Sequence, residues 1–170
     1  GKPYKSSGGK MVFDNQIKKE IPKGWRVFKL SEIALCIMGQ SPKGETYNKE
    51  NKGIPLINGP ADYKNGNLYS KTYTTDPKRI CQKDDLVFCI RATIGNLVIA
   101  DQKYCLGRGV SAVRPKNYKY SELIFFHLQN EIKKFKVRAT GSIIKGITKE
   151  DLNDSFCLVP PKKVLSDFHE

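Results

Sequence analysis

The sequence has no long hydrophobic run, and no apolar stretch approaches the ~18 residues that a transmembrane helix needs. The N-terminal residues also lack the pattern of a signal peptide. We therefore expect a soluble, cytoplasmic protein without a membrane partner. The hydrophobic content of 39% is low for a globular chain, but eight Phe, eight Tyr and one Trp provide bulky side chains for a core. With 170 residues, the chain has the length of one domain.

Histidine and cysteine are scarce, which argues against a metal site. The two histidines, His127 and His169, are far apart in the sequence. The five cysteines have no Cys-x-x-Cys spacing, and this pattern fits reduced thiols in the cytosol better than a disulfide framework or a zinc site. Cys89 and Cys157 lie inside apolar runs, and we predict that both are small core residues.

Motifs for catalysis are also absent. The chain has no Gly-x-Ser-x-Gly elbow, no phosphate-binding P-loop and no convincing Gly-x-Gly-x-x-Gly loop. An adenine methyltransferase would need an Asn/Asp-Pro-Pro-aromatic motif, whereas the single Pro-Pro pair here stands in Val-Pro-Pro-Lys at 159–162. We therefore predict a protein that is not an enzyme and has no cofactor of its own.

One enzyme-like signal is an acidic residue two positions before a lysine, as in some metal-dependent nucleases. It occurs at Glu50, Asp62, Asp76, Asp101 and Glu131. Composition alone predicts about three acidic-x-basic pairs in a chain this basic, so these five carry no weight. A nuclease would also need further carboxylates that converge on the metal ion.

Acidic residues are outnumbered by basic ones. The chain has 17 Asp and Glu against 30 Lys and Arg, which leaves a net charge of +13 and an isoelectric point near 9.5. This imbalance is typical of proteins that bind a polyanion, and it favours a nucleic acid as the partner. A basic surface also serves acidic protein partners or solubility, and charge alone carries no information on base sequence.

Hydrophobic patterning predicts an α+β fold, a single sheet-rich domain with long loops and one main helix. Residues 1–20 are polar and contain glycine and serine, so we interpret them as a linker, and we expect the structured domain at 21–160. Runs of Val, Ile, Leu and Phe predict the strands, several of them covered on both faces. The expected strands are 25–30, 54–57, 85–91, 96–100, 109–113 and 156–159.

The main helix is expected at 121–137, with Ser121 as its N-cap. Short helices are expected at 30–35, beginning near Ser31 as a candidate N-cap, and at 148–152, as a capped turn that begins at Thr148. Residues 161–170 begin a further helix that the sequence does not complete. The buried stripe of the main helix is predicted to be Ile124, Leu128, Ile132 and Phe135. The other predicted core residues are Trp25, Ile90, Val98, Val110, Phe126 and Leu158.

Loops rich in glycine, proline and asparagine carry the polar side chains that are suited to DNA. Asn pairs with adenine and Arg or Lys with guanine in the major groove, and glycines let the backbone approach phosphate. The same residue types are common in ordinary tight turns, and that interpretation stays open for each of them. The candidates for DNA contact are Ser41, Lys43, Thr46, Tyr47, Asn48, Asn58, Asp62, Lys64, Asn65, Arg91, Thr93, Arg108, Ser142 and Lys145.

Taken together and in order, several segments resemble the target-recognition domain of the specificity (S) subunit of type I restriction–modification systems. The similar segments are PYKSSGGKM, IPKGWRVFKLSEI, MGQSPKGETYN, GIPLINGPADY, DLVFCIRATIGNLVIAD, YCLGRGVSAVRP and ATGSIIKGITKEDLNDSFCLVPP. The resemblance implies a non-catalytic domain that reads one half of a split target in double-stranded DNA. It also implies methyltransferase (M) subunits that modify an adenine and restriction (R) subunits that cleave, with S-adenosylmethionine, ATP and Mg²⁺ bound by those partners.

A complete S subunit has two such domains separated by conserved spacer helices. The resemblance therefore suggests that 1–20 is a connector and that 161–170 starts a truncated spacer helix. A recognition domain fused to a single-chain restriction–methylation enzyme and a half-subunit that pairs with itself remain alternatives. From other classes, a basic scaffold for a methyltransferase subunit and an RNA-binding domain are also open, although the scattered tyrosines do not form the stacking platform that RNA binders use.

Overall fold

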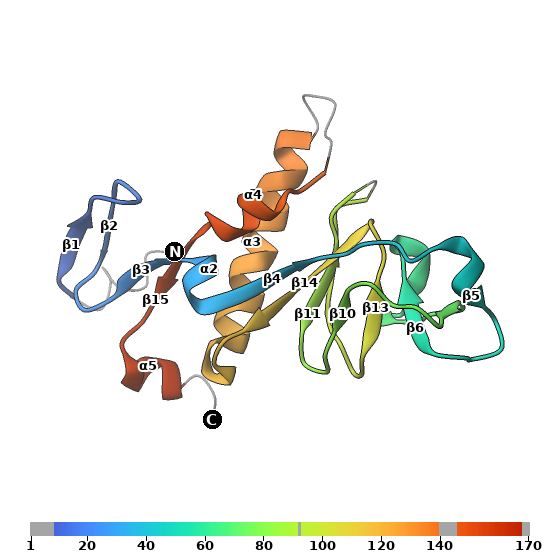
Figure 1. Ribbon diagram of the computed structural model, residues 1–170. Helices are drawn as coiled ribbons and strands as arrows, with labels where there is room; N and C mark the ends of the chain where they lie inside the picture. The colour runs from blue at the N-terminus through green and yellow to red at the C-terminus, as the bar shows by residue number, and fades with distance from the viewer. Residues whose placement is uncertain (1–8, 92, 140–145, 168–170) are drawn as a thin grey trace.

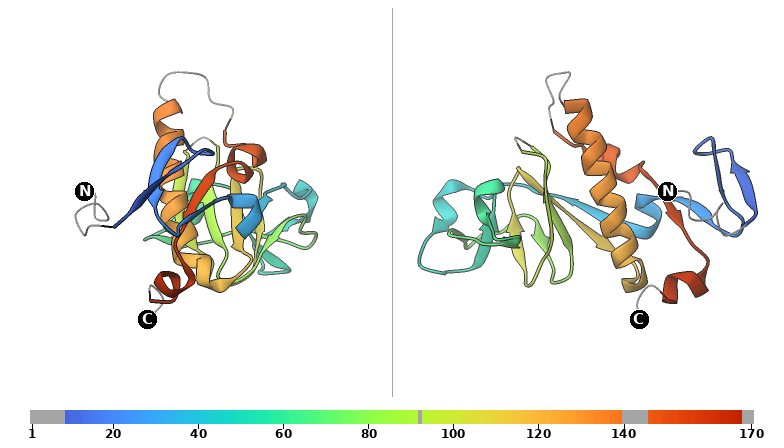
Figure 2. Two further views of the ribbon diagram at one scale, coloured as in Figure 1. Left: turned by 90° about the vertical axis from the view of Figure 1, so that its left-hand side faces the viewer. Right: turned by 180° about the vertical axis from the view of Figure 1, so that it is seen from behind.

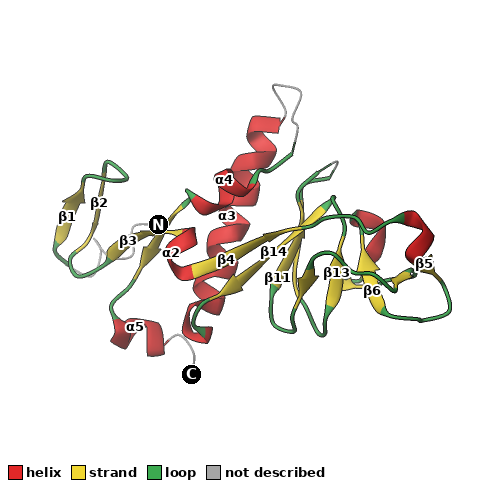
Figure 3. Cartoon of the chain, in the orientation of Figure 1, coloured by secondary structure: helices red, strands yellow, loops and turns green. Residues whose placement is uncertain are grey.

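A computed structural model of the chain describes residues 9–91, 93–139 and 146–167. The α+β expectation is confirmed: Figure 1 shows one long helix, α3 (Ser121–Ala139), lying across strands that extend to both sides of it. Figure 3 shows how much of the remaining chain is strand and loop. The short helices are α2 (Leu30–Ile33), α4 (Lys149–Asn153) and α5 (Lys162–Asp167), with 3-10 turns η1 (Gly44–Thr46), η2 (Pro60–Asp62) and η3 (Tyr118–Tyr120).

A four-stranded antiparallel sheet forms the centre of the molecule. Its order is β12 (Gly95–Ile99), β11 (Leu86–Cys89), β14 (Val110–Pro115) and β4 (Ala34–Met38). A mixed five-stranded sheet packs beside it, with β13 and β6 parallel to each other. The order of that sheet is β10 (Ile80–Cys81), β13 (Tyr104–Leu106), β6 (Ile54–Ile57), β9 (Tyr73–Thr74) and β5 (Tyr47–Asn48).

Three small two-stranded units complete the fold. β3 (Arg26–Lys29) pairs with β15 (Phe156–Val159), so chain segments from the two ends of the domain lie side by side. β7 (Tyr63–Lys64) and β8 (Asn67–Leu68) form a tight hairpin. β1 (Met11–Asp14) and β2 (Lys19–Pro22) form another hairpin, which projects from the body in Figure 1.

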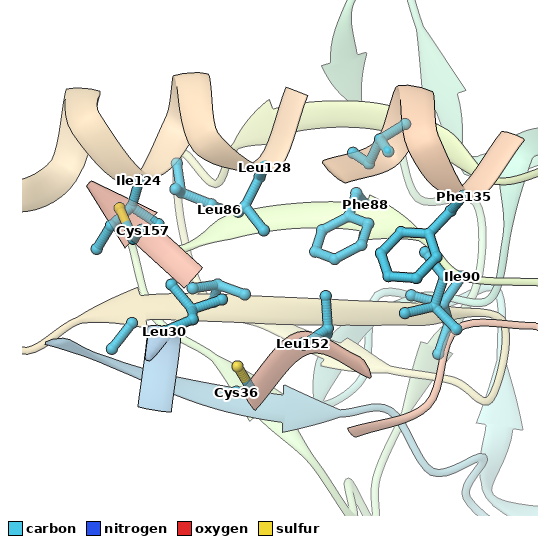
Figure 4. Close-up of a cluster of buried hydrophobic side chains, with 14 of the residues drawn as sticks. Leu30, Cys36, Leu86, Phe88, Ile90, Ile124, Leu128, Phe135, Leu152 and Cys157 are labelled. Carbon is cyan, nitrogen blue, oxygen red and sulfur yellow. The ribbon is translucent and has the colours of Figure 1, made fainter. Parts of the chain in front are cut away.

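Strand β11 is buried on both faces because it separates two hydrophobic clusters. Its side chains alternate, with Leu86 and Phe88 in one cluster and Val87 and Cys89 in the other. The first cluster lies under α3, as Figure 4 shows for Phe88. The second lies between the central sheet and the mixed sheet. The prediction of a strand covered on both faces is therefore confirmed for 86–89, whereas β12 exposes Ile99.

Helix α3 uses the predicted stripe to cover the first cluster. Ile124, Leu128, Ile132 and Phe135 are all buried, and each contributes roughly 1.5–3 kcal/mol of hydrophobic transfer free energy. The prediction that Phe126 is a core residue is wrong, because its side chain is 51% exposed. At ~100° per residue, position 126 lies on the face opposite Ile124.

An ion pair joins Asp85, directly before β11, to Arg114 on the neighbouring strand β14. The Asp85 carboxylate is 1% exposed and accepts two hydrogen bonds from the Arg114 guanidinium, both at 2.8 Å. The same carboxylate accepts the backbone N–H of Gln82 at 2.7 Å. Asp85 is therefore fully engaged in structure, which explains a buried acidic residue without any catalytic role.

The N-terminal part of the domain differs from the sequence-based expectation. We expected structure to begin at Ile21, but residues 11–22 form the β1–β2 hairpin, so the interpretation of 1–20 as an unstructured linker is wrong for its second half. Strand β4 was missed because Ala34 and Leu35 continue the apolar run of the preceding helix. The short strands β5, β7, β8, β9, β10 and β13 were also missed.

Two predicted helix caps are wrong, and one is confirmed. Helix α2 begins after Lys29, whose backbone N–H donates to the Glu32 carboxylate, rather than near Ser31. Ser121 does not cap α3, because η3 precedes it and Asn117 caps that 3-10 turn. Thr148 caps α4 as expected, accepting the N–H of Asp151.

The other core predictions are mostly confirmed. Ile90, Val98 and Val110 are buried, whereas Trp25 and Leu158 are half-buried. All five cysteines are free and buried. Across the described ranges, no helix is long and apolar enough to cross a membrane, and no three His, Cys, Asp or Glu side chains come together as metal ligands.

Candidate DNA interface

Four loop segments that are distant in the sequence meet at one place, which we call the loop rim: residues 39–41, 57–59, 90–91 and 107–109. Backbone hydrogen bonds join the first segment to the last, from the Gly39 N–H to Val110 O at 3.0 Å and from the Gln40 N–H to Leu106 O at 2.8 Å. The Gly107 N–H donates to Ile57 O at 2.8 Å. The loop rim is therefore fixed by the ends of β4, β6, β13 and β14.

A second set of bonds attaches the end of β11 to the same place. The Ile90 N–H donates to Gly109 O, and the Ile147 N–H donates to Ile90 O, both at 2.9 Å. The loop at 107–109 thus lies between the end of β6 and the end of β11. The hydroxyl of Ser41 adds a side-chain contact, because it accepts the backbone N–H of Arg108 at 3.2 Å.

Glycine is required where these segments touch. A Cβ on Gly39 would lie 2.0 Å from Gly107 O and 2.6 Å from Val110 O. A Cβ on Gly109 would lie 2.1 Å from Asn58 O. Both contacts are with backbone atoms, so no side chain could move aside to make room. The glycines that the sequence suggested for close approach to phosphate thus serve close approach of loop to loop.

Three of the predicted contact residues carry exposed polar groups at the loop rim: Asn58, Arg91 and Arg108. The backbone of Asn58 is held by its neighbour, because the Asp62 carboxylate accepts the Asn58 N–H at 2.7 Å. Within the part of the chain that the structure describes, no hydrogen bond or ion pair engages these three side chains. Asn58 and Arg108 combine a backbone held by hydrogen bonds with an exposed amide or guanidinium group, which is the arrangement that base or phosphate contacts need. Arg91 directly follows Ile90, whose N–H donates to Gly109 O.

Helix α3 brings further positive charge to this side of the molecule. A Cβ on Gly95, at the start of β12, would lie 2.9 Å from the Lys136 ammonium nitrogen and 3.8 Å from Ile132. The C-terminal half of α3 therefore lies beside the β11–β12 hairpin, as the two views of Figure 2 show for the ribbons. Arg91 and Thr93 belong to the turn that joins β11 to β12. The basic end of this helix carries three lysines and one arginine: Lys133, Lys134, Lys136 and Arg138.

Several predicted contact residues are engaged in their own loops. Thr46 pairs its hydroxyl with Thr74, and Asn48 binds the backbone of Glu50 and Lys52. Tyr47 donates to Pro42 O at 3.4 Å, and Asp62 caps the turn at 58–59. These residues shape the loops, and this was the alternative that the sequence left open.

The remaining predicted residues divide into three groups. Asn65 has a φ of +52°, and with Gly66 it forms the turn between β7 and β8. Lys43 and Lys64 are exposed, and Lys43 lies 3.8 Å from Glu45. Ser142 and Lys145 lie outside the described residues.

Tyr63 anchors the 58–67 loop to the central sheet. Burial, together with the adjacent Cys89 thiol, raises the pKa of Tyr63 and keeps the phenol uncharged. Tyr63 packs on the second hydrophobic cluster. Next to it, Lys64 and Lys71 both approach the ring of Tyr69. Tyr69 and Lys71 were not among the predicted contacts. The β7–β8 hairpin brings them close to Lys64, and the sequence analysis did not predict this hairpin.

Comparison with known proteins identifies the family. Residues 22–164 match the family model described as the type I restriction modification DNA specificity domain. The chain belongs to this family. As a specificity domain it is also similar to a protein of Methanocaldococcus jannaschii named as a putative type I restriction enzyme MjaX specificity subunit. Those two sequences are 35% identical over 147 residues, which make up 84% of this chain and 34% of that relative.

Solved structures share the fold of this specificity domain. The HsdS subunit from Thermoanaerobacter tengcongensis matches with a TM-score of 0.72 at 30% identity, over 88% of this chain and 36% of that one. A structure described as showing complex assembly and conformational transition of the type I R-M system matches with a TM-score of 0.74 at 30% identity, over 92% of this chain and 39% of that one. The S subunit from M. genitalium, 17% identical with a TM-score of 0.63, shows the fold alone.

The specificity domain spans about a third of the length of these relatives. The matched family is a specificity domain, and the relatives are named as specificity subunits rather than as modifying or cleaving subunits. These names agree with the lack of catalytic motifs in the sequence.

Proposed function

We propose that this domain binds double-stranded DNA and reads one half of a bipartite target for a type I restriction–modification complex. The observation that carries the proposal is the loop rim, where four loops present Asn58, Arg91 and Arg108 on a chain of net charge +13. An Asn amide and an Arg guanidinium make bidentate contacts with adenine and guanine in the major groove. The surrounding lysines and arginines supply salt-sensitive affinity for the phosphates.

In this proposal the chemistry belongs to other subunits. Methyltransferase subunits modify an adenine and restriction subunits cleave, and those partners bind S-adenosylmethionine, ATP and Mg²⁺. The domain contributes sequence recognition only. The relatives are named as specificity subunits, which favours this arrangement over a recognition domain fused to a single-chain enzyme.

Selection from a randomised duplex-DNA pool tests the proposal. The purified chain is incubated with the pool at a low and a high salt concentration, and the bound fraction is sequenced. We expect enrichment of a motif of about three to five base pairs that persists at the higher salt. Salt-sensitive binding without any enriched motif would contradict sequence recognition by this domain, and so would a preference for RNA duplexes over DNA.

A second candidate function, docking of a protein partner, is favoured by an apolar groove of about 410 Å³ beside the start of α3. Ile99 and Phe126 line it and are 58% and 51% exposed. Substitution of Phe126 by Ser should leave DNA binding unchanged, because the groove is separate from the loop rim. If this chain acts as a protein scaffold, the same substitution weakens its association with the methyltransferase subunit.

A further inference from the structure

Two lysines converge on one exposed tyrosine beside the loop rim. The ammonium nitrogen of Lys64 lies 5.1 Å from the centre of the Tyr69 ring, and that of Lys71 lies 5.9 Å from it. All three side chains line a pocket of about 260 Å³ together with Ala61 and Tyr63. Each ammonium is attracted by the π-electrons of the ring, but the two positive charges repel each other.

These lysines differ from three other lysines at this end of the molecule, each of which pairs with a carboxylate two residues away. Lys43 pairs with Glu45, Lys52 with Glu50 and Lys78 with Asp76. Neither Lys64 nor Lys71 has an acidic partner among the described residues. Asp62 is close in sequence, but its carboxylate accepts the backbone N–H groups of Asn58 and Gly59 at 2.7 and 3.3 Å.

The backbone that carries the pocket is fixed on both sides. The Tyr69 N–H donates to Asp62 O at 2.8 Å, and the β7–β8 turn orients Lys64. The hydroxyl of Ser70, directly before Lys71, lies 2.8 Å from Leu56 O and 2.6 Å from Thr72 O, and it accepts the Leu56 N–H at 3.1 Å. Two positive charges are therefore held on an ordered scaffold and face one opening.

We propose that Lys64, Tyr69 and Lys71 form a seat for one backbone phosphate of the bound DNA. This proposal rests on the proposed function, since it takes DNA as the ligand. The two ammonium groups neutralise the phosphate, and the Tyr69 hydroxyl can donate a hydrogen bond to one of its oxygens. The pocket connects to Asn58 through Asp62, whose side chain holds Asn58 and whose carbonyl holds Tyr69. The seat thus fixes the duplex while the loop rim reads the bases.

The test compares two double variants that each remove two positive charges. In Lys64→Gln/Lys71→Gln the seat is neutralised, whereas Lys162→Gln/Lys163→Gln removes two exposed lysines on α5, at the other end of the molecule (Figure 1). Affinity for a duplex with the selected motif is measured over a range of salt concentrations. We expect the seat variant to bind about tenfold more weakly at 0.1 M salt, with a log–log salt slope shallower by about one. The seat variant should enrich the same motif from the randomised pool as the parent does.

The contacted phosphate can also be located. Single phosphates of the duplex are replaced by uncharged methylphosphonates, and each modified duplex is bound to the parent and to the seat variant. At one position the methylphosphonate should weaken DNA binding by the parent but leave DNA binding by the seat variant unchanged. Tyr69→Phe keeps the ring but loses the hydroxyl that donates to the phosphate, and it should bind a few-fold more weakly. Tyr69→Leu also loses the ring that holds the ammonium groups and should bind more weakly still.

Three results would overturn the seat: salt slopes that are equal for the two double variants, no phosphate position that depends on Lys64 and Lys71, or a changed motif. Each of them is distinct from failure of the proposed function, in which the parent itself enriches no motif. Retained DNA binding together with loss of an acidic protein partner would likewise assign the pocket to that partner and overturn the seat.

Discussion

The half of the molecule under α3 and the loop rim are stabilised in different ways. The first is a hydrophobic cluster of residues such as Phe88 and Leu128, contributed by strands and helices. The second is a set of loops held by backbone hydrogen bonds and by glycines packed against carbonyl oxygens. Burial therefore carries the stability of the half under α3, while loop-to-loop contact orients the groups proposed to recognise DNA.

The largest effect is expected in the core. Leu128→Ala removes a fully buried side chain from α3 and should lower the free energy of unfolding by about 3 kcal/mol. Val137→Ala on the same helix is the control, because Val137 is 76% exposed and its truncation should change stability by less than about 0.5 kcal/mol. Chemical denaturation measures the free energy of unfolding of both variants. Equal losses of unfolding free energy in the two variants would show that the buried stripe of α3 does not stabilise the half of the molecule under this helix.

A smaller loss of stability with a larger loss of binding is expected at the loop rim. Gly39→Ala places a Cβ 2.0 Å from Gly107 O, so the loops must separate, at a cost of about 1–3 kcal/mol. DNA affinity should fall at least about tenfold because the groups that read the bases move with the loops. A Cβ on Gly44, in the same loop, would meet no atom within 4 Å, so Gly44→Ala should bind DNA with the affinity of the parent. If both variants bind alike, loop-to-loop contact does not orient the interface.

A still smaller effect is expected from His127 on α3. Burial lowers its pKa below the usual 6.5, Glu131 opposes this shift and Lys134 adds to it, while the Ser155 hydroxyl lies 3.0 Å from its Nε2. The unfolded chain therefore binds this proton more readily than the folded one, so the stabilisation is present above pH 6.5 and is lost as the pH falls through the lowered pKa. Melting temperatures between about pH 7.5 and about pH 5.5 should fall less for His127→Gln than for the parent. Parallel curves would exclude His127 as the cause.

The smallest effect concerns the thiols, which should not react in the folded protein. Burial raises the pKa of Cys36 to about 11 and those of Cys81 and Cys157 to about 12, so the reactive thiolate is scarce as well as inaccessible. An aromatic disulfide reagent should label none of the five cysteines at neutral pH and all of them in denaturant. Fast labelling without denaturant would reveal an opening of one of the two hydrophobic clusters.

The comparison also explains what could be predicted from the sequence. The stripe of α3 and strand β11 were predicted because local periodicity determines which residues are buried. Phe126 was misassigned because its residue type was weighed without its position on the helix. The prediction of Ser121 as a cap is wrong because η3 lies directly before the helix, and no local sequence pattern indicates this 3-10 turn.

The candidate interface was predicted in part. Segments that carry candidate residues meet at the loop rim, and their contact with DNA stays a prediction. Their division into side chains that bond within their own loops and side chains that are exposed was not predictable from the sequence. Asn48 and Asn58 are the same residue type in similar loops, yet the first binds its own turn while the second is exposed with a free amide. That difference depends on Gly107 and Asp62, and only the folded chain brings these residues together. Lys71 was missed for the same reason.

DNA recognition by the loop rim is tested most directly by the specificity ratio of Asn58→Ala/Arg108→Gln, meaning its affinity for the selected motif divided by its affinity for random duplex. Each lost base contact should lower discrimination by about 1–3 kcal/mol, so we expect the ratio to collapse while the binding of random DNA falls only slightly. Lys162→Gln, which removes one positive charge on α5, should keep the ratio of the parent. An unchanged ratio in the Asn58→Ala/Arg108→Gln variant would contradict the assignment of DNA recognition to the loop rim.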